Sequence, residues 1–336
     1  MKKLRIGVIG AGRISRVHTP NLVHRVERAE VVALADIDLE AARKLGEPLG
    51  IPKILTDYRD ILNDPAIDAV FICSPTDTHV TIAVEAVKAG KHIFCEKPVD
   101  QSLTEIRKVI EAVENAGVKC QVGFNRRFDR NFWRIYEAVR QDEVGSVQIV
   151  KISSRDPVAP PVSYVKTSGG IFADMMIHDF DMVEHLSGSR VLEVSTAGAC
   201  LIDPGIGEAG DVDTAVVLLR LESGALAVID NSRQAVYGYD QRIEVFGAKG
   251  MIAAENETMD STTLSTATGV TRAKPLWFFL ERYTDAFVRE EQGFVDACLN
   301  DKDVLISARD SLSPVAIAIA AGKSLVSGGA PVRVER

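Results

Sequence analysis

The sequence lacks the features that mark nucleic-acid-binding and membrane-spanning proteins. Its 39 Lys and Arg residues are outnumbered by 47 Asp and Glu residues, which gives a net charge of −8 at pH 7. Because nucleic-acid phosphates are bound by basic faces, this balance argues against a nucleic-acid partner. No apolar run is long enough to cross a membrane, and the start "MKKLRIGVIGAG" is too short and too rich in glycine for a signal peptide. We therefore expect no membrane partner either.

Cysteine is scarce, and no CxxC pair occurs. The wide spacing of the five cysteines excludes a disulfide framework or a zinc ribbon and predicts a reducing, cytoplasmic setting. Three of them stand in apolar runs and are expected to be small buried hydrophobic residues. These three are Cys73, Cys95 and Cys120, and the other two are Cys200 and Cys298.

The first third of the chain alternates short apolar runs with longer amphipathic ones. The short runs are continuous and rich in Val and Ile, as strands buried on both faces should be. This βαβα rhythm predicts a doubly wound parallel sheet. The expected strands are "LRIGVIG", "VVALAD", "DAVFICS", "HIFCE" and "VKCQVGF", and the expected helices cover 13–27, 38–49, 77–89 and 102–116.

After "VKCQVGF" the rhythm changes to longer strand-like runs with turn signals between them. "LLRLESGALAVID" is typical of a hairpin that turns at Ser223 and Gly224. A chain of 336 residues suits two domains, and we predict residues 1–123 and 124–336, the second an α/β domain with a large, open, mostly antiparallel sheet. Its expected elements are a helix "NFWRIYEAVR", strands over 146–154, 190–202, 212–221, 224–232 and 239–247, and helices over 278–299 and 307–326.

The segment "RIGVIGAGRIS" predicts a dinucleotide site. Gly10, Gly12 and Ser15 have the GxGxx(G/A) spacing directly after a strand and at the start of a helix, with Ser as a small departure at the third position. Such a loop brings the backbone against a pyrophosphate at the positive helix N-terminus. Asp36 ends the next strand, where a carboxylate accepts hydrogen bonds from ribose hydroxyls and repels a 2′-phosphate. Because the next residues, Ile37 and Asp38, supply no Arg to hold such a phosphate, NAD is favoured over NADP.

Two more stretches follow strands at the sheet edge where such folds bind ligands, "CSPTDTH" at 73–79 and "CEKP" at 95–98. A lysine there could hold a substrate oxygen, although a lone Lys is commonly a solvated charge. The remaining residues expected to contact the cofactor are Arg13, Ile14, Ser74, Thr76, His79, Glu96 and Lys97.

The segment "SGGIFADMMIHDFDM" places Asp174 and His178 four residues apart at the predicted start of an apolar helix, where they would share one face. An imidazole with a pKa near 6.5 suits a general base. Two other interpretations stay open: a structural ion pair, or a metal pair, for which no third ligand is evident, so we expect no metal. The neighbouring Asp179, Asp181 and His185 are expected to be structural or solvated. The preceding loop "RDPVAPPVSYVKTSGG" is of the kind that is often functional.

Together, the glycine loop, "EKP" and the GG-x3-D-x3-H spacing resemble the Gfo/Idh/MocA oxidoreductases from end to end. Within that family "QVGFNRRFD", "SRDPVAPP" and "YGYDQRIEVFG" are similar to inositol 2-dehydrogenases of inositol catabolism, which oxidise a ring hydroxyl of myo-inositol to the ketone. The resemblance implies a catalytic set of Lys97, Asp174 and His178. It also implies that Arg127, Asp156 and Tyr239 line the substrate pocket, whereas Arg126 and Arg130 are expected to be surface charges.

The resulting hypothesis is NAD-dependent oxidation of a secondary hydroxyl of a cyclic polyol, with myo-inositol as the substrate and scyllo-inosose as the product. Another inositol isomer, a sugar, or a non-catalytic NAD-binding sensor are the alternatives. The sequence does not decide the isomer, because its choice depends on sub-ångström placement of several side chains. An open sheet would expose apolar runs such as "TAVVLLRL", so we expect sheet-to-sheet dimers, and by resemblance to the family a homotetramer.

Overall fold

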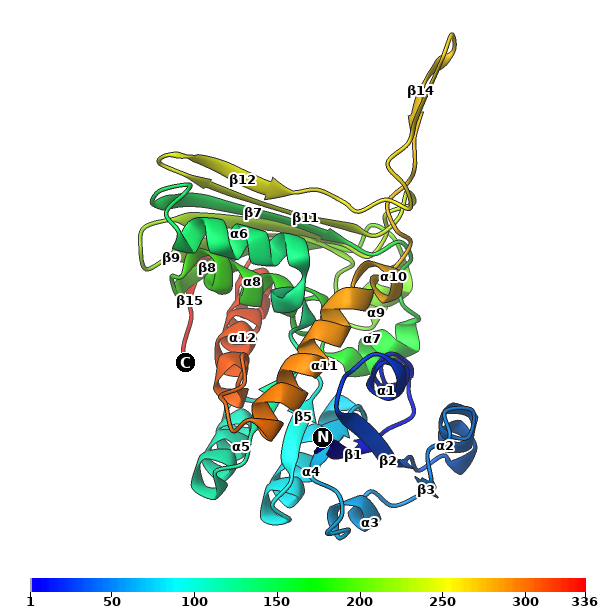
Figure 1. Ribbon diagram of the computed structural model, residues 1–336. Helices are drawn as coiled ribbons and strands as arrows, with labels where there is room; N and C mark the ends of the chain where they lie inside the picture. The colour runs from blue at the N-terminus through cyan, green and yellow to red at the C-terminus, as the bar shows by residue number, and fades with distance from the viewer. Residues whose placement is uncertain (1) are drawn as a thin grey trace. The chain divides into compact units, whose positions relative to one another are not determined.

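A computed structural model describes residues 2–336 and divides the chain into two compact units (Figure 1). Unit 1 comprises Met1–Phe128 and Asp285–Val315, and unit 2 comprises Asp129–Thr284 and Ala316–Arg336. The first crossing lies close to the predicted boundary near residue 123. The division differs from the prediction in the late segment Asp285–Val315, which returns to unit 1.

Unit 1 is built on a six-stranded sheet in the order β3-β2-β1-β4-β5-β6, with every neighbouring pair parallel. This confirms the predicted doubly wound sheet. The three-residue strand β3 was not predicted, because so short a run carries no periodic signal. The strands are β1 (Leu4–Ile9), β2 (Ala29–Ala35), β3 (Lys53–Leu55), β4 (Ala69–Ile72), β5 (His92–Cys95) and β6 (Cys120–Val122).

Aromatic packing explains why the late segment belongs to unit 1. Phe71 of β4 and Phe94 of β5 stack with ring centroids 4.4 Å apart. Phe294 of helix α11 (Thr284–Leu299) meets both rings edge-on, at 5.4 and 5.9 Å. Such a contact joins residues about 200 positions apart, so it leaves no mark in the local sequence pattern. The other helices of unit 1 are α1 (Ser15–His24), α2 (Leu39–Gly46), α3 (Arg59–Leu62), α4 (Thr76–Lys88) and α5 (Leu103–Ala116), with 3₁₀ turns η1 (Asn125–Phe128) and η3 (Ala308–Ser311).

Unit 2 is built on a seven-stranded sheet in the order β12-β11-β7-β10-β9-β8-β15. Its pairs are antiparallel except β7 with β10, and β9 turns into β10 at Gly224, whose φ is +88°. The mostly antiparallel sheet and the hairpin are therefore confirmed. The strands are β7 (Val147–Arg155), β8 (Val191–Ala199), β9 (Thr214–Leu221), β10 (Leu226–Ser232), β11 (Asp240–Gly247), β12 (Gly250–Ala254) and β15 (Val332–Arg333), of which the sequence did not predict β12 and β15.

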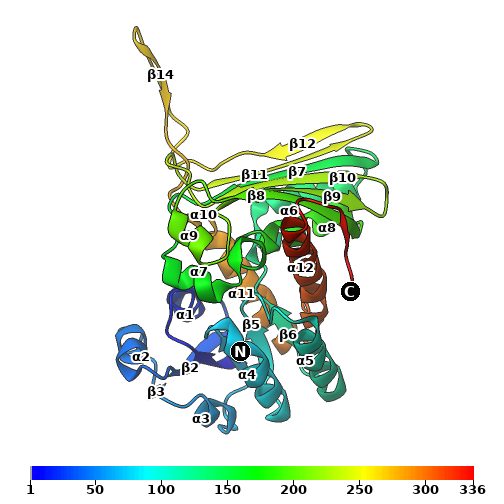
Figure 2. The same cartoon turned by 180° about the vertical axis from the view of Figure 1, so that it is seen from behind.

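The two faces of this sheet differ. Along β7, Val150, Ile152 and Ser154 are buried, while on β9 Val216 and Leu218 point to the other side and remain 46% and 43% exposed. Helices α6 (Arg130–Arg140) and α8 (Ile177–Ser187) cover one face, and no helix of unit 2 covers the other (Figures 1 and 2). The predicted open sheet is thus present.

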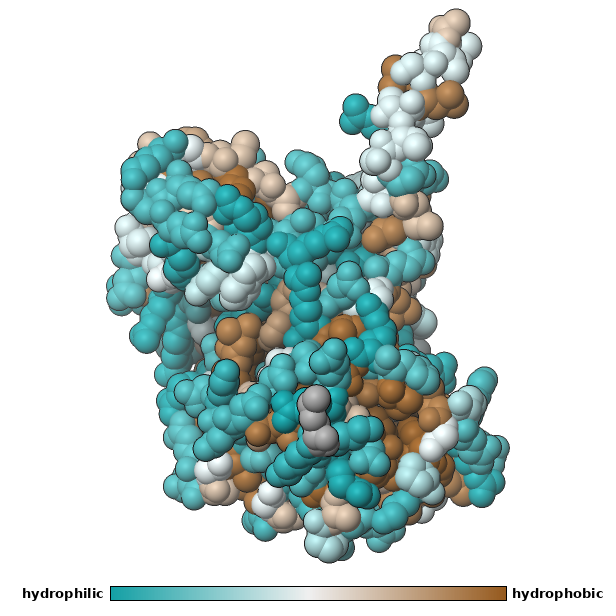
Figure 3. Space-filling view, in the orientation of Figure 1, coloured by the Kyte–Doolittle hydropathy of each residue, from teal (hydrophilic) through white to brown (hydrophobic). Residues whose placement is uncertain are grey.

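A two-stranded hairpin, β13 (Thr263–Thr266) and β14 (Gly269–Arg272), projects from unit 2 (Figure 1). Every residue of both strands is exposed, and the hairpin surface is mostly pale with patches of brown (Figure 3). The predicted late helix over 278–299 is interrupted at Tyr283, which lies between α10 (Phe279–Arg282) and α11. The last helix, α12 (Leu312–Val326), crosses from unit 1 into unit 2.

The described residues settle two smaller expectations. Cys73, Cys95 and Cys120 are buried and, like the other cysteines, free, as predicted. No helix between residues 2 and 336 has the length and apolarity needed to cross a membrane.

Candidate active site

The glycine loop has the geometry that its spacing predicts. Gly10 has a φ of +101°, and a Cβ there would lie 2.7 Å from the backbone carbonyl of Cys73, so only glycine fits. A Cβ on Gly12 would meet no atom within 4 Å, and the residue stands exposed where α1 begins. Ser15 is fully buried and its hydroxyl pairs with Thr19 at 3.1 Å, which shows that a small polar residue is accepted at the third position.

Asp36 connects the end of β2 to this loop. One carboxylate oxygen accepts the N–H of Ala11 at 2.6 Å and the other accepts the N–H of Asp38 at 2.8 Å. These contacts fix the carboxylate beside the glycine loop, where it retains lone pairs for further donors. Asp38 itself caps α2 by accepting the N–H groups of Glu40 and Ala41.

The two strand-end stretches of unit 1 are linked through a buried histidine. His79 has one ring nitrogen 2.8 Å from the carbonyl oxygen of Pro98 and the other 2.9 Å from that of Ser74. Glu96 is also buried, and its Oε2 accepts the N–H of Lys97 at 3.1 Å. Both ring nitrogens of His79 are thus paired with backbone carbonyl oxygens. Six other residues remain predicted contacts of the cofactor: Arg13, Ile14, Ser74, Thr76, Glu96 and Lys97.

Asp174 and His178 do not share one regular α-helix, which corrects the expected start of that helix. Residues Ile171–Met175 form a π-helical turn, closed by the N–H of Met176 on the carbonyl of Ile171 at 2.8 Å, and α8 begins only at Ile177. Gly169 and Gly170, at φ +88° and +76°, lead into the turn. A π-turn inserts one residue into the helical path and is frequent at functional sites. The sequence pattern of apolar residues does not distinguish this turn from an α-helix.

Asp174 has two partners that the sequence did not predict. The hydroxyl of Tyr164 donates to its Oδ1 at 2.9 Å, and the guanidinium of Arg233 lies 3.5 Å from its Oδ2. Arg233 is 1% exposed and also lies 3.7 Å from Asp211, whose other oxygen accepts the N–H of Ile171 at 3.1 Å. Arg233 therefore joins Asp174 to the start of its own π-turn. Tyr164 belongs to α7 (Val162–Ser168), in the loop expected to be functional, whereas no local signal marked Arg233 or Asp211.

Helix α8 is fastened to the sheet by Asp179. This fully buried carboxylate accepts the hydroxyl of Ser154 on β7 at 2.6 Å and the amide of Asn231 on β10 at 3.0 Å. Its structural role confirms the expectation for Asp179. His185, six residues further along α8, stacks on Tyr136 of α6 with ring centroids 4.4 Å apart.

The three residues expected to line the substrate pocket have different settings. Arg127 lies in η1, within unit 1, and donates to Asp310 at 3.2 Å. Asp156 follows β7, with its backbone bonded to Ser232 and Ala235. Tyr239 is mostly buried, edge-on to Phe278 and Tyr283 at 6.0 Å each. The surface-charge prediction is wrong for Arg126, which the 3₁₀ turn carries inward to 3% exposure, and holds for Arg130, which pairs with Glu257.

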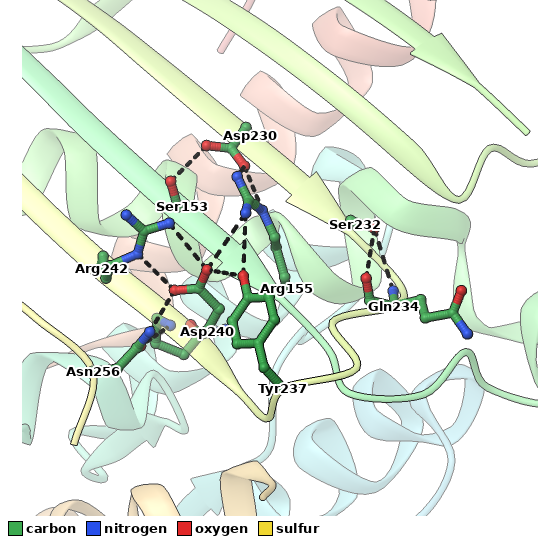
Figure 4. A network of polar contacts seen from close by, with 10 residues as sticks. Ser153, Arg155, Asp230, Ser232, Gln234, Tyr237, Asp240, Arg242 and Asn256 are labelled. Carbon is green, nitrogen blue, oxygen red and sulfur yellow. Dashed lines mark hydrogen bonds and ion pairs between the residues drawn. The ribbon is translucent and has the colours of Figure 1, made fainter. Parts of the chain in front are cut away.

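A polar network joins residues of β7, β10 and β11, and two of its members, Arg155 and Asp240, are the sequence neighbours of Asp156 and Tyr239 (Figure 4). Asp240 accepts from Arg242 at 2.7 Å, from Asn256 at 2.7 Å and from Tyr237 at 2.5 Å. Burial raises the pKa of the Asp240 carboxyl, but these donors outweigh it and lower the pKa below its usual range. Arg155 links the same network to Asp230 of β10. The loop between β10 and β11 is thereby fixed at both ends.

Comparison with known proteins identifies the family. A model of the oxidoreductase family with an NAD-binding Rossmann fold matches residues 4–124, and the Gfo/Idh/MocA C-terminal domain matches residues 132–253. The chain belongs to the Gfo/Idh/MocA family of oxidoreductases. Its NAD-binding Rossmann fold lies in unit 1, as the glycine loop and Asp36 predict.

Relatives in the Gfo/Idh/MocA family match nearly the whole chain. An uncharacterised oxidoreductase of Bacillus subtilis is 48% identical, over 99% of this chain and 97% of the relative. A myo-inositol 2-dehydrogenase of Thermotoga maritima is 46% identical, over 96% of both chains. The crystal structure of scyllo-inositol dehydrogenase from Lactobacillus casei with bound NAD(H) and scyllo-inositol superposes with a TM-score of 0.93, at 31% identity and 99% coverage of both chains.

Proposed function

We propose that the protein oxidises one secondary hydroxyl of an inositol with NAD, most directly myo-inositol to 2-keto-myo-inositol. The observation that carries the proposal is full-length similarity to proteins named as inositol dehydrogenases in a chain that holds Lys97, Asp174 and His178. The reducing setting predicted from the scattered free cysteines supports a cytoplasmic location.

The residues of unit 1 fit NAD. Gly12 offers open space for a phosphate at the N-terminus of α1, where backbone N–H groups and the helix dipole favour an anion. The Asp36 carboxylate would accept the adenosine ribose hydroxyls, and its charge would repel a 2′-phosphate. Ile37, almost fully exposed beside Asp36, offers an apolar surface there. When bound, NAD supplies the hydride acceptor.

The residues of unit 2 fit an uncharged polyol. Such a ligand is recognised by hydrogen-bond donors and acceptors, and Asp174 supplies two acceptor oxygens fixed by Tyr164 and Arg233. Asp156 and Tyr239 lie on segments held by backbone bonds and by the Asp240 network. Arg127 is a further candidate by the resemblance to the family. A preorganised set of this kind orients one hydroxyl among six similar ones.

The proton of the reacting hydroxyl would pass to His178. A neutral imidazole can accept a proton on a ring nitrogen and then return it to solvent or to a neighbour. Asp174, whose backbone lies one turn earlier, would bind an adjacent hydroxyl and stabilise the imidazolium. The Lys97 ammonium would donate to the substrate oxygen as alkoxide charge grows, which lowers the barrier because the charge is larger in the transition state.

A substrate panel tests the proposal. Initial rates of NADH formation would be measured with myo-, scyllo- and chiro-inositol and with glucose. We expect the largest kcat/KM for an inositol, with myo-inositol first. A preference for glucose would mean that the substrate is a sugar and that the type of reaction is as proposed. The absence of turnover with every polyol would favour an NAD-binding sensor.

A further inference from the structure

A buried charged cluster includes Glu96, the residue between the end of β5 and Lys97. His18 of α1 has no exposed surface, and its two ring nitrogens lie 2.7 Å from Glu96 and 2.7 Å from Glu291 of α11. The amide of Asn21 also donates to Glu291, at 3.2 Å. The imidazole is therefore held between the carboxylate of Glu96, which directly follows β5, and another from the segment that returns to unit 1.

The surroundings of this cluster are apolar and tightly packed. The His18 ring meets Phe71, Phe94 and Phe287 edge-on, with centroids 5.1–5.8 Å apart. Burial lowers the pKa of His18, but hydrogen bonds to Glu291 and then to Glu96 outweigh it and raise the pKa to about 10. Buried charges of this kind add little to stability compared with an apolar replacement. What the cluster does provide is a fixed position for each carboxylate.

The fixed carboxylate of Glu96 also holds the backbone of Lys97 in place. Its Oε1 faces His18, and its Oε2 accepts the backbone N–H of Lys97 at 3.1 Å. Gly123 leaves room for this arrangement, because a Cβ there would lie 3.0 Å from Oε1 of Glu96. The backbone on the N-terminal side of Lys97 is thus tied to the imidazole through one side chain.

A second buried histidine holds the other side of Lys97. His79, 1% exposed, contacts the carbonyl oxygen of Pro98 at 2.8 Å and that of Ser74 at 2.9 Å. The carbonyl next to Lys97 is therefore fixed against the start of α4. Lys97 stands between two anchored residues, although its own side chain is only half-buried.

We propose that His18, through Glu96, and His79, through Pro98, are positioning residues for Lys97. The inference rests on the proposed function, in which Lys97 donates to the substrate oxygen. Neither histidine touches substrate: each acts on the backbone from which the Lys97 side chain extends. A displacement of about 1 Å at a reacting group can reduce turnover about 100-fold. A variant that holds the Lys97 backbone less firmly should therefore have a lower kcat.

A double-mutant cycle tests this inference. His18→Gln should lower kcat about 10- to 100-fold with little change in the Kd of NAD. Lys97→Met should lower kcat by itself, and adding His18→Gln to Lys97→Met should cause no further loss, because the group being positioned is gone. His79→Gln should behave in the same way. Lys91→Met is the matched control, because it removes another buried cation of unit 1, whose ammonium binds the carbonyls of Asp64 and Ile67. The fold-change in kcat that Lys91→Met causes should be the same with and without Lys97→Met.

The outcomes separate the inference from the proposed function. If Lys97→Met lowers kcat but the His18→Gln loss persists undiminished beside it, the histidines do not act through Lys97 and the inference is overturned. If Lys97→Met leaves kcat unchanged, the assignment of Lys97 fails as well. Should His18→Gln not fold, Gly123→Ala replaces it in the cycle, because its Cβ presses on Glu96 and leaves every charge in place.

Discussion

At the scale of single residues, carboxylates with defined partners mark both parts of the site. Asp36 is held by two backbone N–H groups at the end of β2, and Asp174 is held by Tyr164 and Arg233 at a π-turn. In each case the partners fix the direction of the carboxylate before any ligand is present. Preorganisation of this kind lowers the cost of binding and of reaching the reactive geometry.

Replacing Asp36 should change the choice of cofactor. Asp36→Ala removes both the acceptor for the ribose hydroxyls and the charge that repels a 2′-phosphate, so the kcat/KM with NAD should fall and the ratio of NAD to NADP should approach one. Steady-state kinetics with both cofactors measures this. A wild-type enzyme that prefers NADP would contradict the assignment of Asp36.

Replacing His178 should slow the chemical step and leave cofactor binding unchanged. His178→Ala removes the proposed base, and the expected loss in kcat is roughly 10²–10⁴-fold. NAD affinity, measured by fluorescence titration, should stay near the wild-type value, because His178 belongs to unit 2. The control is His185→Ala, a histidine of the same helix that stacks on Tyr136 and should retain most of the activity. Near-normal turnover in His178→Ala would place the base elsewhere.

At the scale of elements, the sequence predicted the helices and strands that leave a clear local pattern of apolar residues. The strands of unit 1 are buried on both faces, so runs such as "AVFI" in β4 stand out as continuous apolar segments. The exposed hairpin β13–β14, rich in Thr, has no apolar alternation and was not predicted. The π-turn at Asp174 and the pairing of Arg233 with it depend on hydrogen bonds between distant segments, which residue order does not reveal.

One buried carboxylate fixes the loop that leads into β9, and its loss should depend on pH. Asp213 accepts the N–H groups of Leu201, Ile202 and Asp203, and its backbone carbonyl accepts the N–H of Arg233. Burial raises the pKa of Asp213, but the donors outweigh it and lower the pKa below the usual value. A carboxyl with a depressed folded-state pKa stabilises the fold above its unfolded pKa of about 3.9, and this contribution disappears as the pH falls through the folded value.

Asp213→Asn should therefore lower the Tm by about 2–4 °C at pH 7, and the difference from the wild type should shrink at pH values below about 4. Differential scanning fluorimetry across this range measures both. Asp260→Asn is the control for loss of a carboxylate at an exposed turn, where Asp260 accepts the N–H and the hydroxyl of Thr262. A difference in Tm that stays constant down to pH 3 would show that the charge of Asp213 does not contribute.

At the scale of the whole molecule, the open face of the unit 2 sheet exposes apolar side chains that no helix of unit 2 covers. Val216, Leu218, Leu226, Phe246 and Met251 expose apolar surface there between charged side chains. Monomers seldom expose a large contiguous apolar face. A second copy placed sheet-to-sheet would bury these side chains, and two such dimers would form the tetramer expected from the family resemblance.

A single lysine on that face should weaken the assembly. Val216→Lys places a charge where the sheet of a second copy would pack, so light scattering at micromolar concentration should show a smaller mass than the wild type. Val326→Lys is the matched control, because Val326 is an exposed valine that belongs to helix α12 and not to a strand of the sheet. A wild-type protein that scatters as a monomer would rule out the sheet-to-sheet dimer.

The most direct test of the proposed reaction follows the hydrogen that leaves the substrate. The enzyme would be incubated with NAD and with myo-inositol that carries deuterium on C2. The mass of the NADH formed would then be measured by mass spectrometry. If this chain transfers hydride from C2 of myo-inositol to NAD, each NADH carries one deuterium, and His178→Ala forms it at least 100-fold more slowly. NADH without deuterium, or no NADH at all, would contradict the proposed function.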